Sequence, residues 1–149
     1  MTTSTGVNST LDFMSTVDFT GNYGGYSGTL SLSGTRATFY DVTTFTANRA
    51  GSLGGGLFYN QGAVVTFLKL VRFVSNTAGS YGGGVYGDSA TLTFSDSVIL
   101  TGNKANNDGG GVLVQNGGSL SFKQALDIVG NQVSISISTC RSIPHASCG

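Results

Sequence analysis

The chain is poor in charge and in the residues from which catalytic and metal sites are usually built. Only 9% of its 149 residues are charged, the formal net charge is zero, and all seven acidic residues are aspartate. A neutral chain gives no electrostatic basis for binding nucleic acid or an anionic membrane surface. The one histidine, His145, and the two cysteines offer no credible catalytic triad or zinc site, each of which needs several such side chains together. We therefore expect no cofactor, no metal and no nucleic-acid partner.

Long apolar runs and strong helix formers are also scarce. No run approaches the roughly 18 apolar residues that span a bilayer, so we expect no transmembrane segment in this chain. Residues 1–10 lack the basic and apolar regions of a secretory signal, so either the chain is not secreted by that route or it is a piece of a longer protein. Much Ser, Thr, Val, Phe and Tyr favours all-β structure.

The chain instead contains a repeat of five units. Each unit ends in an asparagine, and successive asparagines are 26, 28, 27 and 28 residues apart. Phenylalanine stands nine residues before each of these asparagines, and a bulky apolar residue stands three before it. Glycine stands six residues after four of them and opens Gly-Gly-Gly in three. The asparagines are Asn22, Asn48, Asn76, Asn103 and Asn131, and the phenylalanines are Phe13, Phe39, Phe67, Phe94 and Phe122.

Within each unit the bulky residues lie two positions apart, which is the period of a strand with one buried face. Three short strands in each unit of about 27 residues can bury that face only by pairing in parallel with the same strands one unit away. This predicts a single-stranded parallel β-helix of about five coils with three strands per coil, right-handed as such crossovers are. We assign it residues 11–131, with 1–10 as a leader of unclear order and 132–149 as a tail outside the repeat.

Stacking the units places equivalent residues in columns. The five asparagines are predicted to form a ladder of side-chain amides at one corner, and the five phenylalanines a stack of rings in the core. The glycine triplets mark turns with positive φ or places where backbones approach closely. Because both features recur in every coil, they favour a scaffold over a ligand site.

The segments "FTGN", "FTAN" and "FVSN", their variants "LTGN" and "IVGN", and the downstream "GGGL" and "GGGV" carry a resemblance. They resemble the repeats of the chlamydial polymorphic outer membrane proteins over about residues 11–131, although the first unit has "GTLS" in place of the triplet. Members of that family are autotransporter-type surface proteins, with an exported β-helical passenger implicated in adhesion. The resemblance implies a location that is cell-surface, outer-membrane-associated or secreted.

One column holds ionisable groups, seven residues before the asparagines: Asp41, Lys69 and Asp96 on consecutive rungs. These are the only candidate catalytic residues, in an enzyme that resembles pectate lyases and uses aspartate-bound calcium and a basic residue. The alternative is an exposed ladder of ion pairs worth about 0–1 kcal/mol each. The site lacks the further carboxylates that Ca²⁺ prefers, so the ladder is favoured.

Other features leave alternatives open. A column with Thr38, Thr66 and Thr93 faces outward, but its neighbours are too mixed for the flat threonine array of ice-binding solenoids. Four tyrosines are candidates for an exposed aromatic surface or for core and corner packing: Tyr40, Tyr59, Tyr81 and Tyr86. Cys140 and Cys148 are either a disulfide or two thiols, and Asn8 begins a glycosylation sequon only on a eukaryotic secretory route.

Taken together, these patterns predict a non-catalytic, cell-surface or secreted β-helical repeat module that acts in adhesion or surface interaction. Its expected partner is a host or neighbouring surface protein or a glycan. Two alternatives remain at this point. One is a polysaccharide-active enzyme of the pectin lyase-like fold, and the other is a self-stacking segment of a larger surface protein, which would associate end to end.

Overall fold

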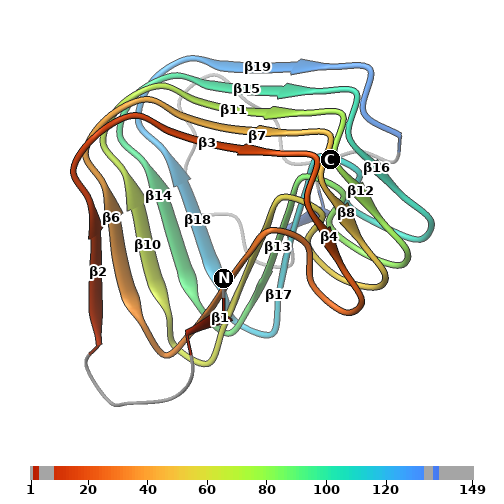
Figure 1. The fold of residues 1–149 in the computed structure, drawn as a ribbon, viewed down its shortest axis with the longest axis horizontal. Helices are drawn as coiled ribbons and strands as arrows, with labels where there is room; N and C mark the ends of the chain where they lie inside the picture. Colours follow the sequence, from red (N-terminus) through yellow and green to blue (C-terminus); the bar gives the residue numbers. More distant parts are fainter. Residues whose placement is uncertain (1, 4–8, 133–135, 138–149) are drawn as a thin grey trace.

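A computed structural model of the chain describes residues 2–3, 9–132 and 136–137, and within them every element is a β-strand. The strands form four parallel sheets, which Figure 1 shows wound as successive coils. Sheet A contains β1 (Thr2–Thr3), β5 (Leu30–Ser33), β9 (Leu57–Asn60), β13 (Val85–Asp88), β17 (Val112–Gln115) and β20 (Ser136–Ile137). Sheet B contains β2 (Thr10–Phe13), β6 (Arg36–Phe39), β10 (Val64–Phe67), β14 (Thr91–Phe94) and β18 (Ser119–Phe122).

The remaining two sheets complete each coil. Sheet C contains β3 (Val17–Thr20), β7 (Thr43–Thr46), β11 (Val71–Val74), β15 (Val98–Thr101) and β19 (Leu126–Val129). Sheet D contains the two-residue strands β4 (Tyr23–Gly24), β8 (Arg49–Ala50), β12 (Thr77–Ala78) and β16 (Lys104–Ala105). The predicted all-β parallel solenoid is confirmed, with about 27 residues per turn and about four turns between its five rungs.

The register is the one that the repeat predicts. Each residue of a rung pairs with the residue one repeat away, as Phe67 does with Phe39 on one side and Phe94 on the other. Sheet D is an addition to the three expected strands per coil. A two-residue strand is too short to show a period-two pattern, so the sequence gives no signal for it.

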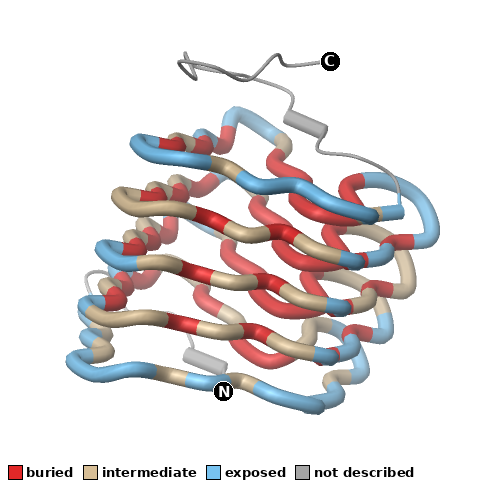
Figure 2. The backbone as a smooth tube through the Cα atoms, turned by 90° about the horizontal axis from the view of Figure 1, so that it is seen from above, coloured by how far each residue is buried: buried red, intermediate tan, exposed pale blue. Residues whose placement is uncertain are grey.

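The core is built on two columns of stacked rings. Phe39 stacks on Phe13 and Phe67 with ring centroids 4.3 Å apart on each side, and the column continues through Phe94 to Phe122. A second column runs along sheet C, where Phe45 and Phe73 stack at 4.7 Å. Rings of the two columns meet edge to face, the favoured geometry for such pairs. Figure 2 shows the buried segments of the backbone at equivalent places in successive coils.

The asparagines line the corner between sheets C and D as a continuous hydrogen-bonded column. The side-chain nitrogen of Asn48 donates to the Asn76 side-chain oxygen at 3.0 Å and to the backbone carbonyl of Phe19 at 2.9 Å. The backbone N–H of Asn48 donates to that same Asn76 oxygen. Asn76 and Asn103 repeat the pattern, and these three side chains are fully buried. The column therefore satisfies the bent backbone at this corner.

The residue before each asparagine has a left-handed backbone conformation. In three coils it is glycine, but Ala47 and Ser75 hold φ values of 53° and 54° in the others. A side chain in this region costs about 1–2 kcal/mol, whereas glycine adopts it freely and loses somewhat more entropy on folding. We expect Ala47→Gly to raise the free energy of unfolding by about 0.5–1 kcal/mol, measured by urea titration. Thr46→Gly, in the adjoining strand, should lower it, and a loss of stability in Ala47→Gly would contradict this explanation.

Loops that follow sheet D fold back across the outer face of sheet A. Phe58, Tyr86 and Leu113 point outward on that sheet, yet each is at least 93% buried because Leu53 and Tyr81 of the loops pack on them. The glycine triplets make this path available. Their first glycines all have positive φ, and a Cβ at the second glycine of the first triplet, Gly55, would lie 2.2 Å from the carbonyl oxygen of Gly83. The loops of successive coils therefore stack backbone on backbone.

Candidate functional site

The outer face of sheet D carries a column of polar and aromatic side chains. Each strand has two residues, so one side chain points inward and the other outward. The inward positions of three strands are Ala50, Ala78 and Ala105, all nearly fully buried. The outward positions follow one another in register, one per coil: Tyr23, Arg49, Thr77 and Lys104, with Gln132 bridged to the last.

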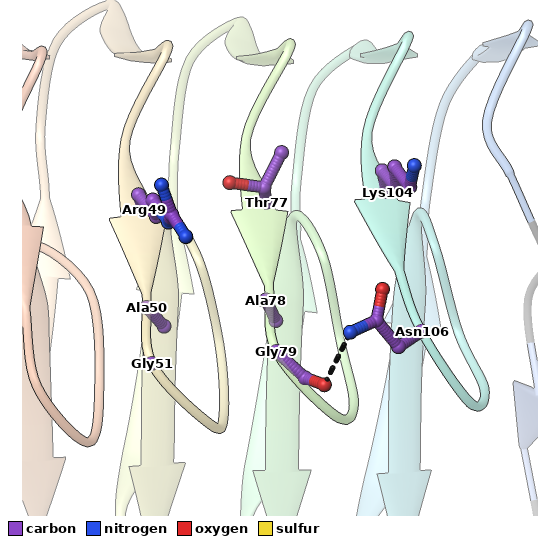
Figure 3. A pocket seen from close by; sticks show the side chains of 8 residues that line it. All are labelled: Arg49, Ala50, Gly51, Thr77, Ala78, Gly79, Lys104 and Asn106. Carbon is purple, nitrogen blue, oxygen red and sulfur yellow. Dashed lines mark hydrogen bonds between the residues drawn. The ribbon is translucent and has the colours of Figure 1, made fainter.

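A hollow of about 280 Å³ lies along the middle of this face. Its lining comes from three successive coils: Arg49, Ala50, Gly51, Thr77, Ala78, Gly79, Lys104 and Asn106 (Figure 3). The residue after the inward alanine is glycine in the first two of these coils, because a Cβ at Gly51 or Gly79 would lie 2.0 Å from a backbone oxygen of the coil before it. In the third coil Asn106 stands there, and its side-chain nitrogen donates to the carbonyl of Gly79 at 2.8 Å.

The electrostatics of the hollow are one-sided. Two of its lining residues, Arg49 and Lys104, are exposed cations, and no lining residue is acidic. Among the described residues neither cation forms an ion pair, and the Arg49 guanidinium lies 6.0 Å from the centre of the Tyr23 ring. Tyr23 and Tyr26 are 71% and 62% exposed. The face can therefore offer positive charge, amide and hydroxyl groups, and open aromatic rings to a ligand.

The ionisable column at Asp41, Lys69 and Asp96 lies at the corner between sheets B and C. Within the described part of the chain these three side chains form no ion pair, so the ladder of ion pairs weighed for them is wrong. Asp41 instead accepts a hydrogen bond from the backbone N–H of Val42 at 2.7 Å, and Asp96 accepts one from Ser97 at the same distance. Each aspartate stands one residue before the N–H group that it caps, so its carboxylate reaches that N–H easily. The side chain of the next rung is about 4.8 Å away along the solenoid axis. Lys69 is exposed.

Of the two interpretations of the four tyrosines, packing holds for Tyr59 and Tyr86. Tyr59 is fully buried because it lies at an inward position of sheet A, and its burial raises the pKa of the hydroxyl far above its ordinary value. Tyr86 is 4% exposed under the loops, and its pKa is raised first by burial and then by the nearby Asp88. Tyr40 is 41% exposed and Tyr81 is partly buried.

Several sequence features fall outside the described residues: Asn8, Cys140, His145 and Cys148. Within residues 9–132, no group of three or more His, Cys, Asp or Glu side chains is placed to hold a metal ion. The part of the chain that the structure describes contains no helix long and apolar enough to cross a membrane.

Comparison with protein-family models, with curated proteins and with solved structures finds no match to this chain.

Proposed function

We propose that this chain is a non-catalytic binding module of a cell-surface or secreted protein, and that it acts in adhesion. The observation that carries the proposal is the outer face of sheet D. There, exposed side chains of successive coils stand in register beside a hollow, on a frame fixed by the buried asparagine column. A rigid frame orders its surface groups before binding, so little entropy is lost when a partner binds.

Two further points support this assignment. The repeat motifs resemble those of surface-exported passengers, which agrees with a location at the cell surface, at an outer membrane or outside the cell. The aspartates of the alternative catalytic column are already hydrogen-bonded to their own corner backbone, and Lys69 stands beside them without an ion pair. Such carboxylates serve as local caps.

The test measures binding and cleavage on the same samples. Fluorescently labelled protein is added to eukaryotic and bacterial cells and to polysaccharide-coated surfaces, with and without calcium, and the chain length of the soluble polysaccharides is followed in parallel. We expect saturable binding that calcium does not change, and no shortening of any polysaccharide. Calcium-dependent shortening that Asp41→Asn and Lys69→Gln abolish would overturn the proposal and establish the enzyme in its place.

A further inference from the structure

Resting on the function proposed above, we propose that the outer face of sheet D binds a linear acidic glycan, laid along the solenoid axis across successive coils. The anionic groups of the glycan contact Arg49 and Lys104, and its sugar rings contact Tyr23 and the polar side chains between them.

The two cations of the face are spaced along the solenoid axis. Arg49 and Lys104 are both in register with Thr77, one rung to either side of it. Two rung spacings of a parallel sheet amount to roughly 9.6 Å. Backbone pairing fixes this separation for the Cα atoms of Arg49 and Lys104, from which the two charged side chains extend. The face therefore matches a polymer whose negative groups recur at about that distance along an extended chain, and it matches a single compact anion less well.

The side chains between and beside the cations suit a sugar chain. Thr77 offers a hydroxyl and Asn106 an amide at the hollow, which are groups that hydrogen-bond to sugar hydroxyls. Tyr23 stands one rung before Arg49 with 71% of its surface exposed, and an exposed Tyr ring has one apolar face and one polar tip. A glycan presents the same combination of apolar ring faces, hydroxyl edges and charged substituents.

The charge density of the face does not suit the other large anions, nucleic acid and anionic bilayers. Duplex DNA carries a charge every 1.7 Å or so, and proteins bind it through many closely spaced cations. This face has two cations over three rungs, and the whole chain has no net charge. An anionic bilayer is bound by clustered basic residues with apolar groups that insert, and the lining of this hollow is mostly glycine, alanine and polar side chains.

The experiment measures the affinity of the full chain for defined oligosaccharides by titration calorimetry. The probes are a sulfated heparin hexasaccharide, a carboxylated oligogalacturonate and neutral cellohexaose, with inorganic polyphosphate as an anion that has no sugar. We expect at least one acidic glycan to bind about tenfold or more tightly than cellohexaose, and to bind more weakly as salt shortens the screening length. The comparison of the first two probes identifies sulfate or carboxylate as the preferred group.

Two double variants separate the site from general charge. Arg49→Gln with Lys104→Gln should weaken binding of the acidic glycan about tenfold. Arg72→Gln with Lys123→Gln removes the same charge from sheet C and from the residue that follows β18 of sheet B, and should change affinity less than about twofold. Tyr23→Ala should weaken glycan binding while leaving polyphosphate binding unchanged. All of these residues are at least partly exposed, so the variants should keep the wild-type unfolding midpoint.

Some results would overturn the inference. These are equal affinity of the first double variant and the wild type, equal binding of cellohexaose, or a Tyr23→Ala effect that is the same for polyphosphate as for the glycan. Binding to cells that none of the acidic glycans competes would refute this ligand and leave the adhesion module standing. Absence of any saturable surface binding would refute the module itself.

Discussion

Replacing Asn76 by alanine is expected to lower the free energy of unfolding by about 4 kcal/mol, a large share of the stability of a domain of this size. The Asn76 side-chain oxygen accepts bonds from the backbone N–H and the side chain of Asn48, and its nitrogen donates to the carbonyl of Phe45. Alanine would leave the Asn48 backbone N–H buried without a partner, at about 1–3 kcal/mol, and would remove one further bond each from the Asn48 amide, the Phe45 carbonyl and the Asn103 oxygen, at about 1 kcal/mol each. Urea unfolding followed by circular dichroism measures the loss.

The matched control is Asn22→Ala at the first coil. Asn22 is exposed, and Asn48 keeps the bond that it accepts from the Asn22 backbone N–H at 3.0 Å. Asn22→Ala should therefore lower the free energy of unfolding by about 1 kcal/mol or less. Equal losses for the two variants would mean that the asparagine column contributes through local turn preference and not through its buried bonds.

The second large effect concerns a pair of residues stacked on sheet A. Tyr59 is in register with Gly87 of the next coil, and a Cβ at Gly87 would lie 2.2 Å from the Cζ atom of the Tyr59 ring. Gly87→Val should therefore lower the free energy of unfolding by about 3 kcal/mol through overpacking. The Tyr59 hydroxyl is buried with no hydrogen-bond partner among the described residues, so the ring occupies this space at some cost.

The double variant Tyr59→Leu with Gly87→Val should recover most of that loss. In this column Leu32 precedes Tyr59 and Val114 follows Gly87. The double variant therefore extends the Leu of one end and the Val of the other into the two middle coils. Tyr59→Leu alone should cost about 2 kcal/mol, because it leaves a cavity above Gly87. A double-mutant cycle of unfolding free energies measures the coupling, and losses that simply add would show that the two residues do not share this space.

The sequence allowed the fold to be predicted because its columns keep one phase over five units. Phe67 and its equivalents in the other units predict the core, and the spacing between them alone predicts which residues pair from coil to coil. Sheet D could not be predicted, since the two residues that follow each asparagine are too few to show the alternation of buried and exposed side chains. Tyr59 was open to both interpretations, because a large polar-tipped side chain at an inward position is acceptable only when its neighbour is as small as Gly87.

The candidate site illustrates the same limit. Arg49 and Lys104 each follow an asparagine of the column, so their alignment is present in the sequence. The outward direction of these two side chains cannot be read from the sequence, because it depends on the bend at the corner and on the inward position of the neighbouring alanines. The column at Asp41 was visible in sequence as a row of charges, but the local bonds of its aspartates to corner N–H groups appear only in three dimensions.

The most direct test of the binding account is a titration of isotopically labelled protein with the acidic glycan, followed by the chemical shifts of the backbone amides. The account predicts that the largest shifts fall on sheet D and its hollow, at Tyr23, Arg49, Thr77, Lys104 and Asn106. Shifts that are largest at the corner of Asp41 and Asp96, or on sheets A, B and C of the first and last coils, would contradict it.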